Sequence, residues 1–225
     1  MKKLLAAIIA AALLLSGCSL SSRPAVSAPP AETPSPSPTP IVTPTPAPEP
    51  SDDELVLVRD YIPGIFIDLK YATTDNFTGQ VIYDSDEAYL RYGTVKKLLA
   101  AQNELSGRGL SLKIWDAYRP VSAQFKLWEI CPNPVYVSNP NNGYSKHSRA
   151  NTVDITLITD TGESIPMPSG FDDFTSLADR DYSDVSAEAA ENARLLESIM
   201  VENGFVPYSG EWWHYSDSVS YDVYG

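Results

Sequence analysis

Cysteine and histidine are both scarce in this sequence of 225 residues, with two of each. Because Cys18 falls in an N-terminal targeting segment, Cys131 alone remains for a folded domain, and no internal disulfide framework is expected. Basic residues are also few, since 16 Lys and Arg against 29 Asp and Glu give a net charge of −13. Nucleic acid and a bare anionic lipid surface are therefore poor candidates for partners.

A long apolar run is missing too. The run at residues 4–15 is too short to span a bilayer and suits the apolar part of a signal peptide. It follows two lysines and ends in Leu15-Ser16-Gly17-Cys18, which resembles the lipobox of bacterial lipoproteins, where the cysteine is acylated. We interpret residues 1–17 as a lipoprotein signal peptide and predict an extracytoplasmic protein that is held to the bacterial cell membrane by a lipid anchor only. An ordinary secretory signal that contains a cysteine is the alternative.

Prolines are concentrated in residues 18–50, where they alternate with Ser, Thr and Ala from Pro24 onward. Proline fits neither the interior of a helix nor a central strand, and this stretch has almost nothing apolar to bury. We predict an extended linker that begins at the lipidated Cys18. The remaining residues, 51–225, suffice for one domain with a hydrophobic core.

Hydrophobic periodicity predicts strands and helices in residues 51–225. Alternating apolar residues indicate strands at 55–58, 65–69, 111–115, 152–158, 205–208 and 212–215. Helical signals indicate helices at 84–104, 120–128 and 186–203, the first opened by a capping box of Asp84 and Glu87. Helices combined with hairpin-linked strands predict an α+β fold, a single domain with a mostly antiparallel sheet and flanking helices.

The two histidines, His147 and His214, become candidate metal ligands when they are considered together with a carboxylate, Asp154. Asp154 points away from the apolar face of the strand predicted at 152–158 and therefore needs a polar partner. Zinc binds imidazole nitrogen and carboxylate oxygen, and a catalytic zinc ion needs three protein ligands and an open position. His147, Asp154 and His214 are thus candidate ligands of one zinc ion on the sheet.

Glu211 precedes His214 by three residues and is a candidate base toward a metal-activated water. Residues three apart in a regular strand face opposite sides, so this role requires an irregular strand start near Gly210. An aromatic hairpin packed on the core, with Glu211 in solvent, accounts for the same spacing. The spacing alone leaves both interpretations open.

Several ordered segments resemble the D-alanyl-D-alanine dipeptidases of the VanX type. They are the Ser-x-His-x₆-Asp run at 145–154 and Glu-Trp-Trp-His at 211–214, with supporting segments at 70–79, 115–120, 165–172 and 204–205. The resemblance covers essentially all of residues 60–220. It implies a zinc D,D-dipeptidase domain in residues 51–225.

The resemblance also implies roles for individual residues. His147, Asp154 and His214 match the zinc ligands of the family, Glu211 matches its general base, and Arg119 matches an arginine that steadies the developing oxyanion.

Three further residues match those that hold the free D-Ala-D-Ala dipeptide: Tyr71, Ser145 and Asp172, with Tyr71 and Asp172 near its ammonium group. The chain departs from the family pattern at Ala150, where glycine is usual, and at Thr152, where a small residue is usual. If the turn at Ala150 requires a positive φ, alanine strains it.

Three functions compete at this point. A dipeptidase is favoured by Asp172 and Tyr71, which would cap the amino end of the substrate. A D,D- or L,D-carboxypeptidase that trims peptidoglycan stem peptides would use a similar zinc site, and the predicted surface location favours it. A non-catalytic lipoprotein that binds cell-wall peptides is disfavoured by the intact Glu211 and Arg119.

Overall fold

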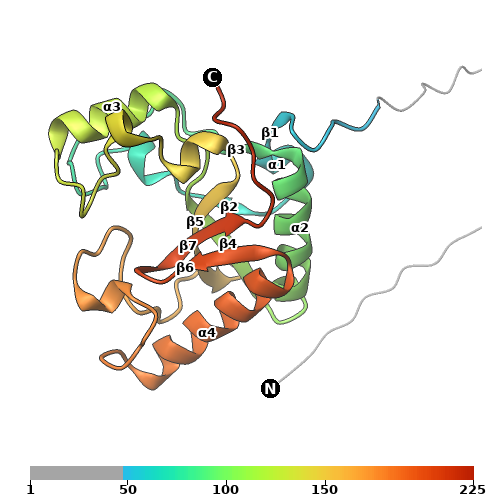
Figure 1. The fold of residues 1–225 in the computed structure, drawn as a ribbon. Coiled ribbons are helices and arrows are strands. Elements are labelled where there is room, and N and C mark those ends of the chain that lie inside the picture. The colour runs from blue at the N-terminus through green and yellow to red at the C-terminus, as the bar shows by residue number, and fades with distance from the viewer. Residues whose placement is uncertain (1–47) are drawn as a thin grey trace, which may run out of the picture. The chain divides into compact units, whose positions relative to one another are not determined.

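The computed structural model describes residues 48–225, so the predicted signal peptide, Cys18 and nearly all of the linker lie outside the described residues. A five-stranded sheet with the order β2-β4-β5-β7-β6 lies at the centre (Figure 1). Its strands are β2 (Phe66–Ile67), β4 (Leu110–Asp116), β5 (Thr152–Thr159), β6 (Phe205–Tyr208) and β7 (Glu211–Asp217). β2 is parallel to β4 and the other neighbouring pairs are antiparallel, which confirms the prediction of a mostly antiparallel sheet.

Two long helices pack on this sheet. Helix α2 (Tyr92–Ser106) contacts β4, helix α4 (Ala187–Glu202) contacts β5, β6 and β7, and the two helices contact each other (Figure 1). Helix α4 begins after Ser186, whose side chain accepts a hydrogen bond from the Ala189 N–H at 3.1 Å. Its buried stripe includes Leu196, Ile199 and Met200, and Leu195 beside them is partly buried.

Shorter elements surround the remaining part of the sheet. Helix α3 (Val121–Ile130) confirms the helix predicted at 120–128, but it begins one residue later, with Pro120 as its N-cap, and ends two residues later. Four 3₁₀ turns lie in the connecting segments: η1 (Lys70–Ala72), η2 (Pro140–Asn142), η3 (Lys146–Arg149) and η4 (Ser176–Ala178). Two of them are adjacent to central strands, since η1 contacts β4 and η3 contacts β5.

The helix predicted at 84–104 is wrong in its first part. Residues 84–88 are not helical, and strand β3 (Tyr89–Arg91) precedes α2 and pairs with β1 (Leu55–Leu57). The Glu87 carboxylate accepts a bond from the Tyr89 hydroxyl and caps no helix. The pairing of β3 with β1, which are distant in the sequence, therefore determines the structure here, and the local capping signal of Asp84 and Glu87 does not. The strands predicted at 55–58 and 65–69 are also shorter in the structure. Residue 58 begins the helical turn α1 (Val58–Tyr61), and β2 holds only two residues.

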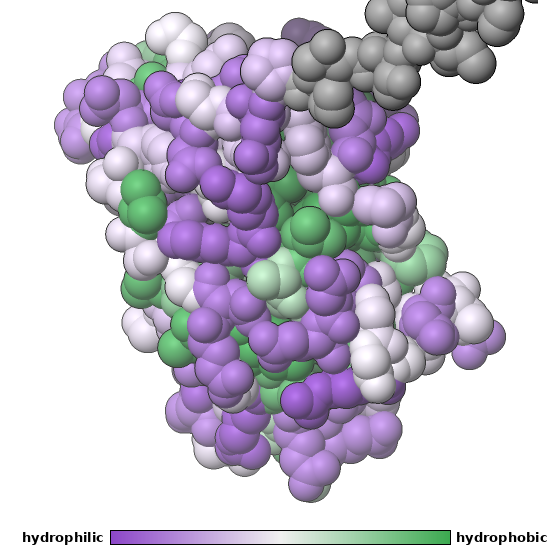
Figure 2. Space-filling model, turned by 90° about the vertical axis from the view of Figure 1, so that its right-hand side faces the viewer, coloured by the Kyte–Doolittle hydropathy of each residue, from purple (hydrophilic) through white to green (hydrophobic). Residues whose placement is uncertain are grey.

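Figure 2 shows mainly hydrophilic side chains on the face that carries α2, with hydrophobic residues gathered near its middle. Within residues 48–225, no helix is long and apolar enough to cross a membrane.

Candidate active site

The predicted metal ligands come together at the end of the sheet. Asp154 on β5 pairs in register with His214 on β7, and His147 lies in η3, which leads into β5. The Oδ1 atom of Asp154 is 3.0 Å from Nδ1 of His214, and its Oδ2 atom is 3.2 Å from Nε2 of His147. One ligand atom from each residue lies within 4.8 Å of the others. We call these three residues the triad.

The triad suits a divalent metal ion such as zinc. Two imidazole nitrogens and one carboxylate oxygen are the donor set of a three-ligand catalytic zinc site. The His147 Nδ1–H donates to the Ala117 carbonyl at 2.8 Å, which directs the lone pair of Nε2 toward Asp154. Burial raises the pKa of Asp154, but the nearby His147 outweighs it and leaves the pKa below its usual value. The carboxylate is therefore charged and available as a ligand.

The loop that carries His147 is held by a short cap and a strained turn. The Ser145 hydroxyl accepts a hydrogen bond from the His147 N–H at 3.3 Å. Ala150 ends η3 in the left-handed conformation, with φ of 58°, and is fully buried. The departure from glycine at this position thus falls on a residue with positive φ, where a Cβ atom is unfavourable.

Glu211 faces the triad from the start of β7. Its Oε2 atom is 3.4 Å from Nδ1 of His214. Burial is the main cause that raises the pKa of Glu211 to about 7, and repulsion by Asp154 adds to it. A carboxyl group with a pKa near neutrality can both take up and release a proton at working pH.

A cavity of about 280 Å³ opens beside these residues and includes Ser145, Lys146, Tyr208, Glu211 and His214 in its walls. This volume is at the small end of ligand sites, which suits a small substrate. Lys146 lines this cavity, and its charge acts on His214. Its side chain makes no hydrogen bond or ion pair within residues 48–225, so its ammonium group is available to a ligand. Sequence reasoning missed Lys146, although it lies between Ser145 and His147.

Arg119 is fixed next to the triad by a buried carboxylate. Its Nε and Nη2 atoms donate to Asp116 Oδ2 at 3.1 and 2.5 Å, and its Nη1 atom donates to Gln124 Oε1 at 2.9 Å. The Tyr83 hydroxyl donates to the other oxygen of Asp116 at 2.5 Å. Asp116 Oδ2 also lies 3.6 Å from Nδ1 of His147, so this carboxylate links the arginine to the triad.

Sequence reasoning missed Asp116, Tyr83 and Gln124. A signal was present for Asp116, because an aspartate three residues before an arginine at the end of a predicted strand suggests an ion pair. Tyr83 had no such signal, since it reaches Asp116 from a separate segment.

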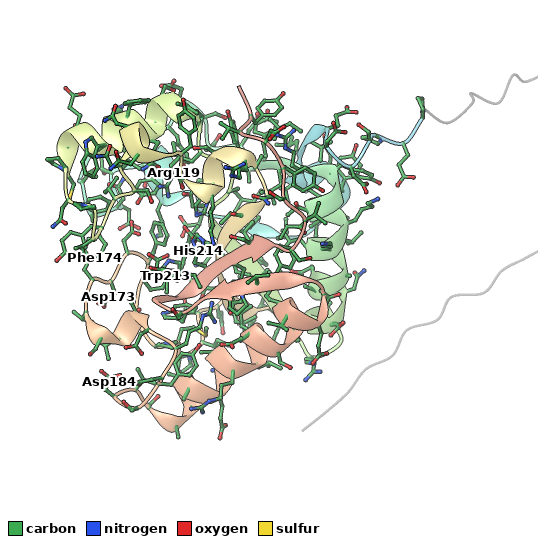
Figure 3. All side chains as sticks on the ribbon, in the orientation of Figure 1. Arg119, Asp173, Phe174, Asp184, Trp213 and His214 are labelled. Atoms are coloured by element: carbon green, nitrogen blue, oxygen red, sulfur yellow. The ribbon has the colours of Figure 1, made fainter. Side chains whose placement is uncertain are left out.

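The predicted substrate-binding residues Tyr71 and Asp172 contact each other. The Tyr71 hydroxyl donates to Asp172 Oδ2 at 2.7 Å, and the Arg119 guanidinium lies 5.1 Å from the Tyr71 ring centroid. Burial raises the pKa of Asp172 to about 7 against the hydrogen bond from Tyr71, which lowers it. The adjacent Asp173 instead accepts bonds from Thr175. Figure 3 shows Arg119 and His214 toward the centre, with Asp173 and Phe174 on the neighbouring loop.

Comparison with known proteins gives consistent matches over this domain. A family model described as D-ala-D-ala dipeptidase matches residues 51–221. The D-alanyl-D-alanine dipeptidase of Escherichia coli K12 is 39% identical over 162 residues, which are 72% of this chain and 83% of that protein. The D-alanyl-D-alanine dipeptidase of Enterococcus faecium is 37% identical over 174 residues, which are 68% and 86% of the two chains.

A solved structure, VanYB in complex with D-Alanine-D-Alanine, matches with a TM-score of 0.40 at 17% identity, over 59% of this chain and 74% of that chain. This likeness is too distant to transfer function.

The mixed α+β domain, its largely buried triad and the family match define a metallopeptidase. The chain belongs to the D-ala-D-ala dipeptidase family of the M15 peptidases, and the resemblance inferred from its sequence segments is confirmed.

Proposed function

We propose that this protein is a zinc-dependent dipeptidase that hydrolyses free D-Ala-D-Ala. The observation that carries the proposal is the pairing of Tyr71 with Asp172 beside Arg119 and the triad, because a carboxylate at this place can receive the ammonium group of a free dipeptide. The named relatives in Escherichia coli and Enterococcus faecium support the choice of substrate.

His147, Asp154 and His214 would hold one zinc ion per chain. When bound, zinc acidifies a water molecule and polarises a carbonyl group. Glu211 is the group that takes a proton from the attacking water and returns it to the nitrogen of the leaving D-Ala. Its position, with Oε2 3.4 Å from Nδ1 of His214, supports this role.

Arg119 stabilises the negative charge that develops on the substrate's carbonyl oxygen. A guanidinium has five N–H donors. In Arg119, one N–H of each nitrogen already donates within the protein: Nε to Asp116 and Tyr83, Nη1 to Gln124 and Nη2 to Asp116. Two donors are left for substrate. Because Asp116 holds the guanidinium in place beforehand, little reorganisation is required as the charge appears.

The ends of the dipeptide carry opposite charges, and the site offers a partner for each. Asp172, with Tyr71, would bind the ammonium group. Ser145 and Lys146, which line the cavity with Glu211 and His214, would bind the carboxylate of the leaving D-Ala. The assignment of Lys146 rests on its free ammonium group in the cavity wall.

The test is hydrolysis of D-Ala-D-Ala by the zinc-loaded protein, with L-Ala-L-Ala and a stem pentapeptide ending in D-Ala-D-Ala measured alongside. Release of D-Ala from the free dipeptide alone supports the dipeptidase. Release from the pentapeptide would instead establish a wall-trimming carboxypeptidase. Zinc binding without cleavage of any substrate would contradict a catalytic role and favour a cell-wall-peptide-binding protein.

We also propose that the enzyme is extracytoplasmic and lipid-anchored through Cys18. The support is the sequence of residues 1–18, with its basic start, apolar run and Leu15-Ser16-Gly17-Cys18 ending. Radiolabelled fatty acid fed to cells that express the full chain is expected to label the wild type, while the Cys18→Ser variant stays unlabelled. Equal labelling of both proteins would contradict this anchor.

A further inference from the structure

Two exposed aromatic side chains meet next to the site, from loops far apart in the sequence. Tyr136 belongs to the loop after α3, and Phe174 belongs to the segment between β5 and α4. Their ring centroids are 4.3 Å apart, although each side chain remains 45% exposed. In Figure 3, Phe174 lies at the outer end of its loop, where that loop approaches the one after α3. This contact therefore spans a gap between two loops and belongs to no buried core.

The contact continues toward the pair expected to hold the substrate's amino end. Phe174 packs edge-on against Phe77 at 5.3 Å, and Phe77 packs edge-on against Tyr71 at 6.3 Å. Tyr71 in turn donates its hydroxyl to Asp172. A row of four rings thus runs from Tyr71 to Tyr136. We call it the aromatic row.

The other end of the row forms part of the cavity wall. Tyr136 lines the cavity of about 280 Å³ together with Glu211 and His214. The row consequently borders the site from the Tyr71–Asp172 pair to the cavity that contains the proposed base. A peptide with residues before its D-Ala-D-Ala end would have to leave the site on the side of Asp172, which precedes Phe174 by two residues, so the extended chain would meet the contact between Phe174 and Tyr136.

We propose that Tyr136 and Phe174 act as a gate that sets substrate length, so that a free dipeptide fits and peptides extended at the amino end are excluded. This inference rests on the proposed function and assigns the residues that enforce it. Exclusion has two parts: the ring contact obstructs an extended chain, and Asp172 loses its ammonium partner when that nitrogen becomes an amide. The first part depends on Tyr136 and Phe174, so it can be removed without changing any proposed ligand or the base.

The test compares D-Ala-D-Ala with the tripeptide L-Lys-D-Ala-D-Ala, from which a carboxypeptidase step would release D-Ala. The variants are Tyr136→Ala and Phe174→Ala, which break the same contact from opposite loops, so a folding defect in one leaves the other informative. We expect kcat/KM for the dipeptide to stay within about threefold of wild type in Phe174→Ala, because Phe174 is not part of the cavity wall. The ratio of tripeptide to dipeptide kcat/KM is expected to rise at least tenfold in each variant.

Phe125→Ala is the matched control, because Phe125 is a similarly exposed aromatic residue, 43% exposed, on α3. It should leave the ratio unchanged. An unchanged ratio in both gate variants, with dipeptide cleavage retained, would overturn the gate and leave the proposed function standing. A wild-type protein that cleaves neither peptide would instead overturn the proposed function, and the two failures are therefore distinguishable.

Discussion

The carboxylate of Glu211 lies 3.4 Å from Nδ1 of His214, although the two residues are three positions apart in the same strand. A regular strand would turn them to opposite faces. The register between β6 and β7 shifts here, since Pro207 pairs with Tyr215 while the next residue, Tyr208, pairs with Glu211. This bulge brings the proposed base to the face of the strand that carries a triad histidine.

Replacement of Glu211 by glutamine should separate chemistry from metal binding. Glu211→Gln keeps the size of the side chain but removes the group that accepts the proton. We expect kcat for D-Ala-D-Ala to fall by roughly 10²- to 10⁴-fold, the range typical of general acid–base catalysis. Zinc content, measured by atomic absorption, should remain near one per chain, because the triad is untouched.

Glu188→Gln, at an exposed position in the first turn of α4, serves as the control and should be fully active. Activity of Glu211→Gln within a few fold of wild type would remove Glu211 as the base.

Ala150 provides a stability prediction. Its left-handed backbone, with φ of 58°, costs an alanine about 1–2 kcal/mol, and glycine removes that cost. The gain is partly offset because glycine loses more conformational entropy on folding and leaves the space of a buried methyl group. We therefore expect Ala150→Gly to raise the free energy of unfolding by up to about 1 kcal/mol, measured by urea denaturation.

Ala88→Gly is the matched control, since Ala88 is also fully buried but does not have a positive φ. It should be destabilising. If Ala150→Gly lowers stability as much as Ala88→Gly does, strain at residue 150 is not significant.

The sequence was most informative where the chemistry is encoded within short segments. The triad and Glu211 come from two such segments, and β5 pairs with β7 so that Asp154 lies opposite His214. Tyr83 could not be found in this way, because its contact with Asp116 joins positions 33 residues apart and depends on the tertiary fold. The start of α2 was mispredicted for the same reason, because the pairing of β1 with β3 joins distant segments.

Lys146 should affect substrate affinity more than turnover. Lys146→Met keeps the apolar stem and removes the charge proposed to meet the substrate carboxylate. We expect KM for D-Ala-D-Ala to rise roughly 3- to 10-fold with little change in kcat, as for a partly exposed charge pair. The effect should shrink at high ionic strength, which screens exposed charges.

D-Ala-D-Ala amide offers a direct check, because it lacks the carboxylate and should show the same KM with both proteins. Lys96→Met, which removes a lysine that pairs with Asp52 outside the cavity, should not change KM for either substrate. A rise in KM that is equal for the acid and the amide would show that Lys146 does not bind the carboxylate.

Asp172 gives a prediction for the pH dependence of stability. Its pKa is raised by burial from 3.8 to about 7. Between pH 4 and pH 7 the carboxyl group of Asp172 is ionised in the unfolded chain but protonated in the folded protein. Its contribution to stability is therefore fully present below about pH 4 and is lost as pH rises through 7. Asp172→Asn removes the ionisation, and asparagine also tolerates the positive φ of 52° at this position.

A pKa shift of about three units corresponds to about 4 kcal/mol in the free energy of unfolding. The variant also loses the charged acceptor for the Tyr71 hydroxyl, which lowers the free energy of unfolding by about 1–2 kcal/mol. In the metal-free protein, Asp172→Asn should therefore raise the free energy of unfolding by roughly 2–3 kcal/mol at pH 8. The gain over wild type should decline steadily toward pH 4. Urea unfolding across this range tests the prediction, and a difference between the two proteins that does not vary with pH would contradict it. The zinc-loaded variant should also bind D-Ala-D-Ala more weakly, because the ammonium group loses its partner.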